Sequence, residues 1–304
     1  FIDFLSPKWM AMLEHTLSVA DSLDMGVDLT LGTGWPWGGP MITKEDASAR
    51  LLVRRLSLKK GDVFSEKISG LKTGQALTLK RKDQKVLNHK ETPIKLNGDY
   101  AFNEQGDFKN LSGVVKNDSL YWKAKRNDQF LYFVFEDKTE QRVKRAAPGG
   151  DGWVLDHFSK KGTENYLSTF SKKLDGLNGK IRAIFNDSYE VYGADYTLDF
   201  FNSFVKYRGY DLKPYLNRLF EDDNEISNRI RADYRATLSD LLTQEFATSW
   251  RRWSSSLGVK TKFQAHGSPG NLIDLYASAD IPECETFGSM PYNIKGFRRI
   301  PGGG

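Results

Sequence analysis

Acidic and aromatic residues follow a short apolar run in the second half of the sequence. The run is residues 181–185, and Asp187, Glu190 and Tyr192 come soon after it in the stretch FNDSYEVYG. In a parallel α/β fold, catalytic groups lie where strands end and loops begin, because polar side chains leave the packed interior there. The spacing therefore predicts that Glu190, and with it Asp187, lies at a functional site.

The same acids have a structural explanation. Asp187 or Ser188 could cap a helix, and a glutamate at position 190 would complete a capping box. Residues 191–193, Val-Tyr-Gly, do not continue a good helix, which favours an orientation of Glu190 into a cavity. Asp187 then either orients a substrate or caps a turn.

A second pair of carboxylates occurs in the extended segment IPECETF. Glu283 and Glu285 are two residues apart and face the same side of the strand, whereas Cys284 faces the other side. Two buried carboxylates on one face repel each other and are costly to desolvate. A solvated strand edge, a cation between the two groups, or a catalytic role would each explain the pair.

Three further strand ends carry suitable side chains. In GTGWPWGGP, Trp35 and Trp37 offer flat faces that can stack on sugar rings, although a packed turn explains them equally well. The motif is neither a phosphate loop nor a dinucleotide fingerprint. Asp156 and His157 end one predicted strand and His266 ends another. Either histidine could bind a substrate hydroxyl or serve packing.

The elements that must position these residues alternate between strands and helices. Strands are predicted near 27–31, 152–159, 181–190, 260–266 and 281–288, and helices near 7–25, 164–174, 198–208, 225–257 and 272–279. This order predicts an α/β fold with a (β/α) barrel-type catalytic region, residues 1–50 and 148–304. Residues 51–147 instead alternate apolar and polar side chains, which predicts an inserted all-β module. Five strands are too few for an eight-stranded barrel, so we expect the chain to contain part of one.

Composition narrows the class of protein. The net charge of +5 conceals a basic segment, residues 50–145, and an acidic remainder. The basic side chains are scattered over many strands, which favours a solvated face over nucleic-acid binding. No apolar run approaches the length of a membrane span. The single cysteine, Cys284, excludes an internal disulfide and a thiolate metal cluster.

Several segments together resemble glycoside hydrolase family 106, the bacterial α-L-rhamnosidases. They are FLSPKWMAMLEH, GTGWPWGGP, GWVLDHFS, FNDSYEVYGADYTLDFFNSFVKYRGYDLKPYL and FQAHGSPGNLIDLYASADIPECETFG. Asp187 and Glu190 match the acidic motif of the family, and Glu285 matches a further active-site carboxylate. Family members are longer and carry another acidic strand end downstream.

The resemblance implies a periplasmic or secreted enzyme with a (β/α)-barrel catalytic domain. Such enzymes release terminal α-L-rhamnose from plant or algal polysaccharides or glycosides. They invert the anomeric centre with two carboxylates and usually bind calcium, which accepts several oxygen ligands. We therefore expect a carbohydrate substrate, calcium with Glu283 as a ligand, and neither a nucleic-acid nor a membrane partner.

Inversion requires one carboxyl group to protonate the leaving oxygen and another to activate water, at a separation of ~6.5–9.5 Å. Our hypothesis is that Glu190 is the general acid and that a partly apolar setting, which includes Tyr189 or Tyr192, raises its pKa. Glu285, or a residue beyond Gly304, would be the base. The predicted substrate-binding residues are Asp187, Trp35, Trp37, Asp156, His157, His266 and Tyr192.

Two alternatives to the rhamnosidase function are open at this point. A carbohydrate-binding protein on a hydrolase-like fold would retain the tryptophans and bind sugars without cleaving them. A hydrolase acting on another sugar would use the same carboxylates, because nothing local in the sequence recognises the methyl group of rhamnose.

Overall fold

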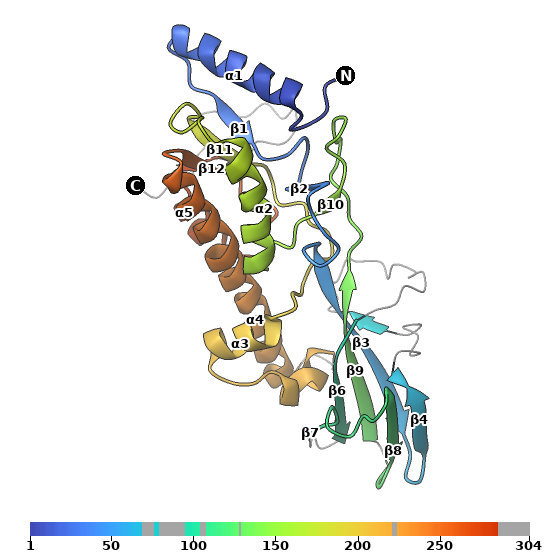
Figure 1. The fold of residues 1–304 in the computed structure, drawn as a ribbon. Coiled ribbons are helices and arrows are strands. Elements are labelled where there is room, and N and C mark those ends of the chain that lie inside the picture. The colour runs from blue at the N-terminus through green and yellow to red at the C-terminus, as the bar shows by residue number, and fades with distance from the viewer. Residues whose placement is uncertain (69–75, 79–94, 104–107, 128, 221–223, 285–304) are drawn as a thin grey trace, which may run out of the picture. The chain divides into compact units, whose positions relative to one another are not determined.

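A computed structural model describes the chain apart from residues 69–75, 79–94, 104–107, 128, 221–223 and 285–304 (Figure 1). Its contacts divide into two compact units. The first unit contains Phe1–Ser48, Glu140–Tyr192 and the chain from Leu238 onward, and the second contains Ala49–Thr139 and Gly193–Thr237. Residues 51–139 of the predicted β-rich insertion thus lie in the second unit together with residues 193–237, whereas residues 140–147 belong to the first unit.

The first unit is built around a parallel sheet with the strand order β1, β11, β12, β13. Its strands are β1 (Asp28–Thr30), β11 (Ala183–Asn186), β12 (Lys260–Phe263) and β13 (Ile281–Pro282). Its helical segments are α1 (Pro7–Ser22), α2 (Lys160–Lys173), the π-helical η3 (Leu242–Ala247), α5 (Thr248–Ser256) and α6 (Leu272–Ala277). The predicted mixed α/β class is confirmed, and four of the predicted strands lie in this sheet.

The fifth predicted strand does not join the parallel sheet, so that part of the prediction is wrong. Within GWVLDHFS only β10 (Trp153–Val154) is extended, and it pairs antiparallel with β2 (Gly38–Gly39). A Cβ atom at Gly38 would lie 2.3 Å from the Trp153 carbonyl oxygen. We call residues 32–40, GTGWPWGGP, the tryptophan loop. Because Gly38 leaves room for this close approach, β10 pairs with the tryptophan loop and not with the parallel sheet.

Helix boundaries follow local capping. Ser6 accepts a hydrogen bond from the Trp9 N–H (3.2 Å) and caps α1 one residue before Pro7. Ser159 caps α2 by accepting from the Gly162 N–H (3.0 Å), so that this helix begins before the predicted residue 164. The predicted long helix is confirmed as α4 (Glu225–Leu241), η3 and α5 in succession, and the unit boundary falls within α4. No helix in the described residues is long and apolar enough to cross a bilayer.

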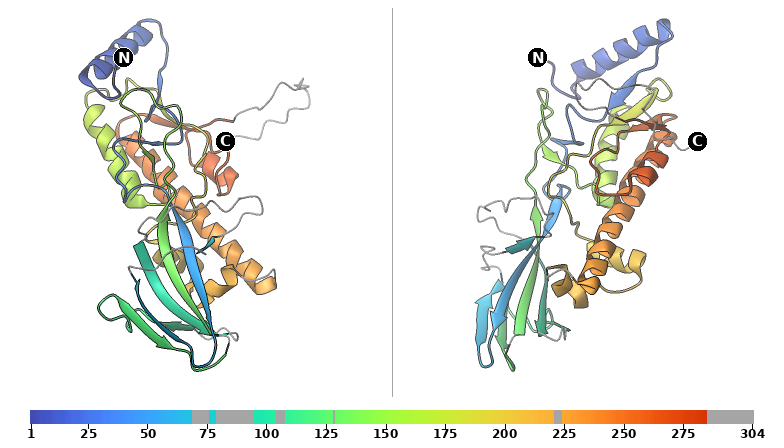
Figure 2. Two further views of the ribbon diagram at one scale, coloured as in Figure 1. Left: turned by 90° about the vertical axis from the view of Figure 1, so that its right-hand side faces the viewer. Right: turned by 180° about the vertical axis from the view of Figure 1, so that it is seen from behind.

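Aromatic side chains form the core between the helices and the sheet of the first unit. Trp37 packs edge-on against Trp250 of α5, with ring centroids 5.1 Å apart, and lies 5.6 Å from the Tyr166 ring of α2. Trp250 in turn contacts Phe263 of β12 at 5.5 Å. Helices α2 and α5 accordingly lie side by side (Figure 1, Figure 2). Buried aromatic pairs of this kind contribute large apolar areas and fix the relative positions of their elements.

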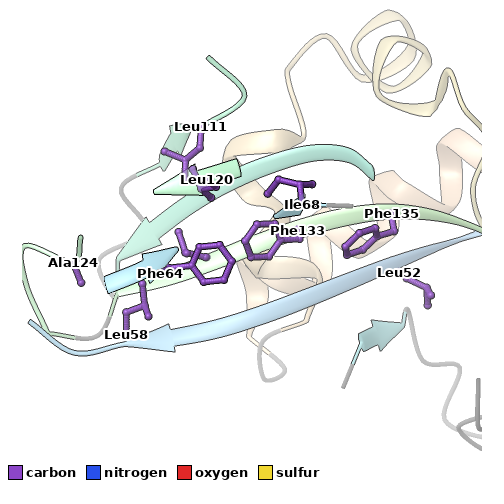
Figure 3. Packing of buried hydrophobic residues seen from close by; sticks show 10 residues of the cluster. Leu52, Leu58, Phe64, Ile68, Leu111, Leu120, Ala124, Phe133 and Phe135 are labelled. Atoms are coloured by element: carbon purple, nitrogen blue, oxygen red, sulfur yellow. The ribbon is translucent and has the colours of Figure 1, made fainter. Parts of the chain in front are cut away.

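The second unit contains two antiparallel sheets. The larger has the order β5, β3, β9, β6, β7, and the smaller pairs β4 with β8. The strands are β3 (Ala49–Leu58), β4 (Val63–Lys67), β5 (Ala76–Thr78), β6 (Lys95–Asn103), β7 (Phe108–Asn110), β8 (Ser119–Lys123) and β9 (Gln129–Lys138). Phe64 of β4 and Phe133 of β9 pack at 5.3 Å within the apolar cluster that joins the two sheets (Figure 3). The helices α3 (Phe200–Arg208) and η2 (Lys213–Leu219, a 3₁₀ helix) and most of α4 complete this unit.

Asp195 ties the segment before α3 to the start of β3. Its Oδ1 accepts from the Leu51 N–H (2.8 Å), and its carbonyl accepts from the Tyr234 hydroxyl (2.7 Å). Desolvation raises the pKa of Asp195 to about 7, although the Leu51 N–H and the positive charge of Arg50 act in the opposite direction. The carboxyl group is therefore easier to protonate in the folded protein than in the unfolded chain.

We predict that Asp195 makes the protein less stable as the pH rises from about 4 to about 7. In this range the folded state binds more protons at Asp195 than the unfolded state, so the free energy of unfolding falls with pH. The limiting slope is about 1.4 kcal/mol per pH unit. Asp195→Asn keeps an oxygen acceptor for Leu51 and should flatten this part of the curve, measured by urea unfolding at several pH values. Asp199→Asn, at an exposed carboxylate, is the control, and identical curves for the wild type and Asp195→Asn would contradict the prediction.

Candidate active site

The carboxyl ends of the parallel strands bring several predicted site segments to one edge of the sheet. The tryptophan loop follows β1, residues 187–190 follow β11, His266 lies three residues after β12, and Glu283 follows β13. This is the edge at which parallel α/β proteins carry their functional loops. Asp156 and His157 follow β10 instead, which lies outside this sheet.

The segment after β11 is held in an extended course and does not begin a helix. The Gln264 N–H donates to the Asn186 carbonyl (2.9 Å), and the Tyr189 N–H donates to the His266 carbonyl (2.8 Å). The next helix, α3, begins only at Phe200. The capping-box explanation of Asp187 and Glu190 is therefore wrong, because no helix begins at this segment.

Gln141 fixes the backbone on both sides of Val191. Its amide nitrogen donates to the Glu190 carbonyl, and its amide oxygen accepts from the Tyr192 N–H, both at 2.7 Å. The side chain thus replaces a neighbouring strand for this short segment. The two contacts position the side chains of Glu190 and Tyr192.

Glu190 is the centre of a polar cluster that also contains Lys144, Tyr192 and Trp35. We call these four residues the Glu190 cluster. The Lys144 ammonium and the Tyr192 hydroxyl both donate to the Glu190 carboxylate, the latter at 3.0 Å. The Trp35 side chain also contributes to the lowered pKa of this carboxylate. A carboxylate has about four lone-pair sites, so the two donors Lys144 and Tyr192 leave room for a further donor from water or a sugar.

These donors hold Glu190 in its ionised form. The hydrogen bond from Lys144 is the largest cause that lowers the pKa of Glu190, and it outweighs partial burial, with further contributions from Tyr192 and Trp35. For Lys144, burial lowers the pKa, and the hydrogen bonds to Glu190 and Tyr192 outweigh it, so that the pKa is raised. The predicted rise in the pKa of Glu190 is wrong, because an ion pair, not an apolar pocket, surrounds the carboxylate.

The tryptophan loop positions Lys144 through the backbone. The Lys144 N–H donates to the Trp35 carbonyl (3.0 Å), and the two residues form an isolated antiparallel bridge. The Lys144 ammonium lies 4.6 Å from the centroid of the Tyr192 ring and 5.8 Å from that of the Trp35 ring. Gly34 makes the bridge possible, because a Cβ atom there would lie 1.9 Å from the Lys144 carbonyl oxygen.

Three of the predicted substrate-binding residues belong to the core instead. Trp37 is 1% exposed, Asp156 is 3% exposed and His157 is 2% exposed. Asp156 accepts from the Phe158 N–H (2.9 Å). Burial lowers the pKa of His157 to about 4, so the ring is neutral at pH 7, and its Nδ1 lies 2.9 Å from the Leu155 carbonyl. All three side chains are thus buried in the core of the first unit, where Trp37 and His157 pack against other aromatic rings.

The remaining predicted residues lie at the same edge of the sheet, outside the Glu190 cluster. Asp187 is half-buried and accepts from the Ser188 N–H (2.7 Å), and His266 is exposed. Glu283 pairs with the Lys262 ammonium at 2.5 Å, and Lys262 also contacts Asp28 at 3.3 Å. Glu285 lies outside the described residues.

The described residues around Glu283 do not fit a calcium site. The Lys262 ammonium already balances the negative charge of Glu283. The hydrogen bond between them raises the pKa of Lys262. Among the residues that the structure describes, no group of three or more histidine, cysteine, aspartate or glutamate side chains could hold a metal ion. A calcium site would need Glu285 or other oxygen ligands from outside this part of the chain.

Comparison with known proteins shows to which family the chain belongs. A profile of the alpha-L-rhamnosidases, glycoside hydrolase family 106, matches residues 104–290, which is more than half of the chain and includes Glu190. The chain is a member of this glycosidase family. The resemblance recognised in the sequence is thereby confirmed.

Two further comparisons extend beyond the residues that the profile matches. The structure is similar to that of a rhamnosidase from Novosphingobium sp. PP1Y, with a TM-score of 0.69 at 17% identity over 92% of this chain and 43% of that chain. A protein of Formosa agariphila named "Putative beta-glucuronidase" is 24% identical over 326 residues, which cover 96% of this chain and 28% of that protein. The chain therefore spans less than half the length of either protein.

Sequence reasoning missed the partners of Glu190 in this rhamnosidase-family site. Gln141 and Lys144 lie in QRVKRAAPGG, which the sequence indicates only as the end of the β-rich segment. The available signal was the clustering of basic residues just before a Pro-Gly-Gly turn. It does not identify the carboxylate, more than forty residues later, with which Lys144 pairs.

We predict that Gly34→Ala destabilises the protein and disturbs the Glu190 cluster. The new methyl group would collide with the Lys144 backbone, and overpacking of this kind costs about 1–3 kcal/mol. Urea unfolding measures the loss. Gly32→Ala in the same loop is the control, because its Cβ would find no atom closer than 3.6 Å. Equal stability of the two variants would show that the bridge does not depend on Gly34.

Proposed function

We propose that this protein is a glycoside hydrolase that releases terminal α-L-rhamnose by an inverting, two-carboxylate mechanism. The observation that carries the proposal is the ionised Glu190 at the end of β11, held by Lys144, Tyr192 and Trp35 within the segment matched by the family. The proposal includes plant or algal polysaccharides or glycosides as substrates and a periplasmic or secreted location. Both of these details rest on family membership.

We further propose that the parallel sheet is one part of a (β/α) barrel, residues 1–50 and 148–304, into which residues 51–147 are inserted. In support of this proposal, the strands of the sheet are all parallel, and their order across the sheet follows their order along the chain: β1, β11, β12, β13. Helix α5 covers one face of the sheet through Trp250 and Phe263. In a barrel, helices cover the outer face, and the loops at the carboxyl edge carry the active site.

The lowered pKa of Glu190 supports a role as the ionised carboxylate of the catalytic pair. An inverting glycosidase needs one such group to take a proton from water as it attacks the anomeric carbon. Glu190 has a lone-pair position left for that water, and Lys144 keeps the carboxylate charged before the reaction. The general acid, which must carry a proton, is then a different carboxyl group, and we propose Glu285 for this role.

The aromatic members of the cluster supply a surface for the sugar. Tyr192 is 59% exposed, and Trp35 is half-buried, so both can contact a ligand, unlike Trp37. Aromatic faces bind the apolar face of a pyranose ring and exclude water from it. Asp187 and His266, at the same edge of the sheet, are proposed as further contacts to the sugar hydroxyls.

A hydrolase acting on another sugar is the second candidate. The similarity to the Formosa agariphila protein named as a beta-glucuronidase favours it, since that match covers nearly the whole of this chain. The same ionised carboxylate would serve either reaction. Comparing rhamnosides with glucuronides as substrates decides between the two.

We predict that Glu190→Gln, introduced into the full-length protein, lowers kcat by about 10²–10⁴-fold, which is the usual contribution of a general base. The loss should be similar for an activated aryl rhamnoside and a natural rhamnoside, because water attack is impaired with both. Added azide, a nucleophile that needs no deprotonation, should restore turnover and give the inverted rhamnosyl azide. Product formation is followed by chromatography.

The control for this experiment is Glu164→Gln, on an exposed pair with Lys160 in α2, which should leave both rates unchanged. Retained activity on the aryl substrate together with loss on the natural one would identify Glu190 as the acid and overturn the assignment. Binding of rhamnosides by the wild type without any release would support a non-catalytic protein.

We predict that Lys144→Met moves the acid limb of the pH profile of kcat/KM to higher pH. Glu190 must be ionised to act, and Lys144 lowers its pKa, so removing the ammonium raises the pH at which activity is lost. Lys144→Arg retains the positive charge and should keep the limb close to that of the wild type. An unchanged limb in Lys144→Met would show that Glu190 does not control it.

A further inference from the structure

Three cations in the segment 142–145 differ in what balances their charge. Arg142 pairs with the Asp151 carboxylate at 2.5 Å, and Lys144 pairs with Glu190. Arg145 pairs with no acidic side chain in the described part of the chain. Its guanidinium carbon lies 5.4 Å from the centroid of the Trp35 ring. Arg145 therefore contributes a positive charge that the described side chains leave uncompensated.

This charge lies beside the Glu190 cluster. The Lys144 ammonium lies 5.8 Å from the centroid of the same Trp35 ring, and the Lys144 N–H donates to the Trp35 carbonyl (3.0 Å). Because Lys144 neutralises Glu190, the net charge of the cluster and Arg145 together is positive. A site that takes only neutral sugars gains nothing from an exposed cation at this position.

The guanidinium group has a defined chemical preference. A guanidinium that stacks on an aromatic ring keeps its N–H donors available for an anion. The paired donors match the two oxygens of a carboxylate. Among carbohydrates, hexuronic acids carry such a group.

We propose that Arg145 binds the carboxylate of a hexuronic acid residue in the substrate, next to the rhamnose that is released. The inference rests on the proposed function and adds to it the class of sugar that neighbours the cleaved bond. Trp35 holds the guanidinium in place from one side, and the uronate contacts it from the other. Arg145 is a specificity-determining residue and takes no part in bond cleavage.

The test uses two substrates that differ only in charge. One is a disaccharide with terminal α-L-rhamnose linked to glucuronic acid, and the other is its methyl ester. In the full-length protein, the disaccharide with the free carboxylate should have a lower KM than its methyl ester. Arg145→Gln should raise the KM for the acid by about 3- to 10-fold, as expected for an exposed charged contact, and leave the KM for the ester unchanged.

Two further variants make the result specific to Arg145. Arg142→Gln removes the same charge from the same segment, away from Trp35, and should leave the preference for the acid intact. Arg145 has a left-handed backbone (φ 53°), which glycine adopts readily. Arg145→Gly should therefore fold as well as the wild type while losing the preference, which separates binding from stability.

The outcomes distinguish this inference from the proposed function. Equal KM values for acid and ester in the wild type, or a preference that survives Arg145→Gln, would overturn the inference while leaving rhamnose release in place. Release of rhamnose from neither substrate would overturn the proposed function. Cleavage of an aryl β-D-glucuronide that depends on Arg145 would show that Arg145 binds the carboxylate of the cleaved sugar itself. That result would overturn the placement of the uronic acid next to rhamnose, and with it the proposed release of rhamnose.

Discussion

The burial of Trp37 is the constraint on which the first unit depends. Its ring contacts Tyr166 of α2, Phe246 of η3 and Trp250 of α5, so one side chain connects the tryptophan loop to the helices behind the sheet. Tyr166 strengthens the connection because its hydroxyl donates to the Leu31 carbonyl at the end of β1. Close packing of this kind allows little displacement. The loop therefore presents Trp35 at a defined place.

The charges of the site follow from that placement. Once Trp35 is fixed, its backbone bridge fixes Lys144, and the ammonium of Lys144 neutralises Glu190. Gln141 holds the other side of the contact by binding the backbone at Glu190 and Tyr192. Neutral hydrogen bonds to the backbone thus join these distant segments of the sequence, without any contribution from side-chain charge. This explains how a half-exposed ion pair can keep a defined geometry.

Much of the fold could be predicted from local patterns. Ser6 before Pro7 marks the start of α1, and the apolar run in residues 129–138 marks β9, because each depends on neighbours close in sequence. The carboxyl ends of β11 and β12 were likewise visible as apolar runs that end in polar residues. The pairing of β10 was not, because a short extended segment does not specify its partner.

The sequence by itself determined the family, the mixed α/β class and the choice of Glu190 as the central carboxylate, since these depend on residue types and short spacings. Only the tertiary structure decided which tryptophan is fully buried, because Trp35 and Trp37 have the same local signal and differ in burial. It also decided the protonation state of Glu190. The pKa of a carboxyl group is set by the charges that folding brings within hydrogen-bond distance, and Lys144 reaches Glu190 only through the folded backbone.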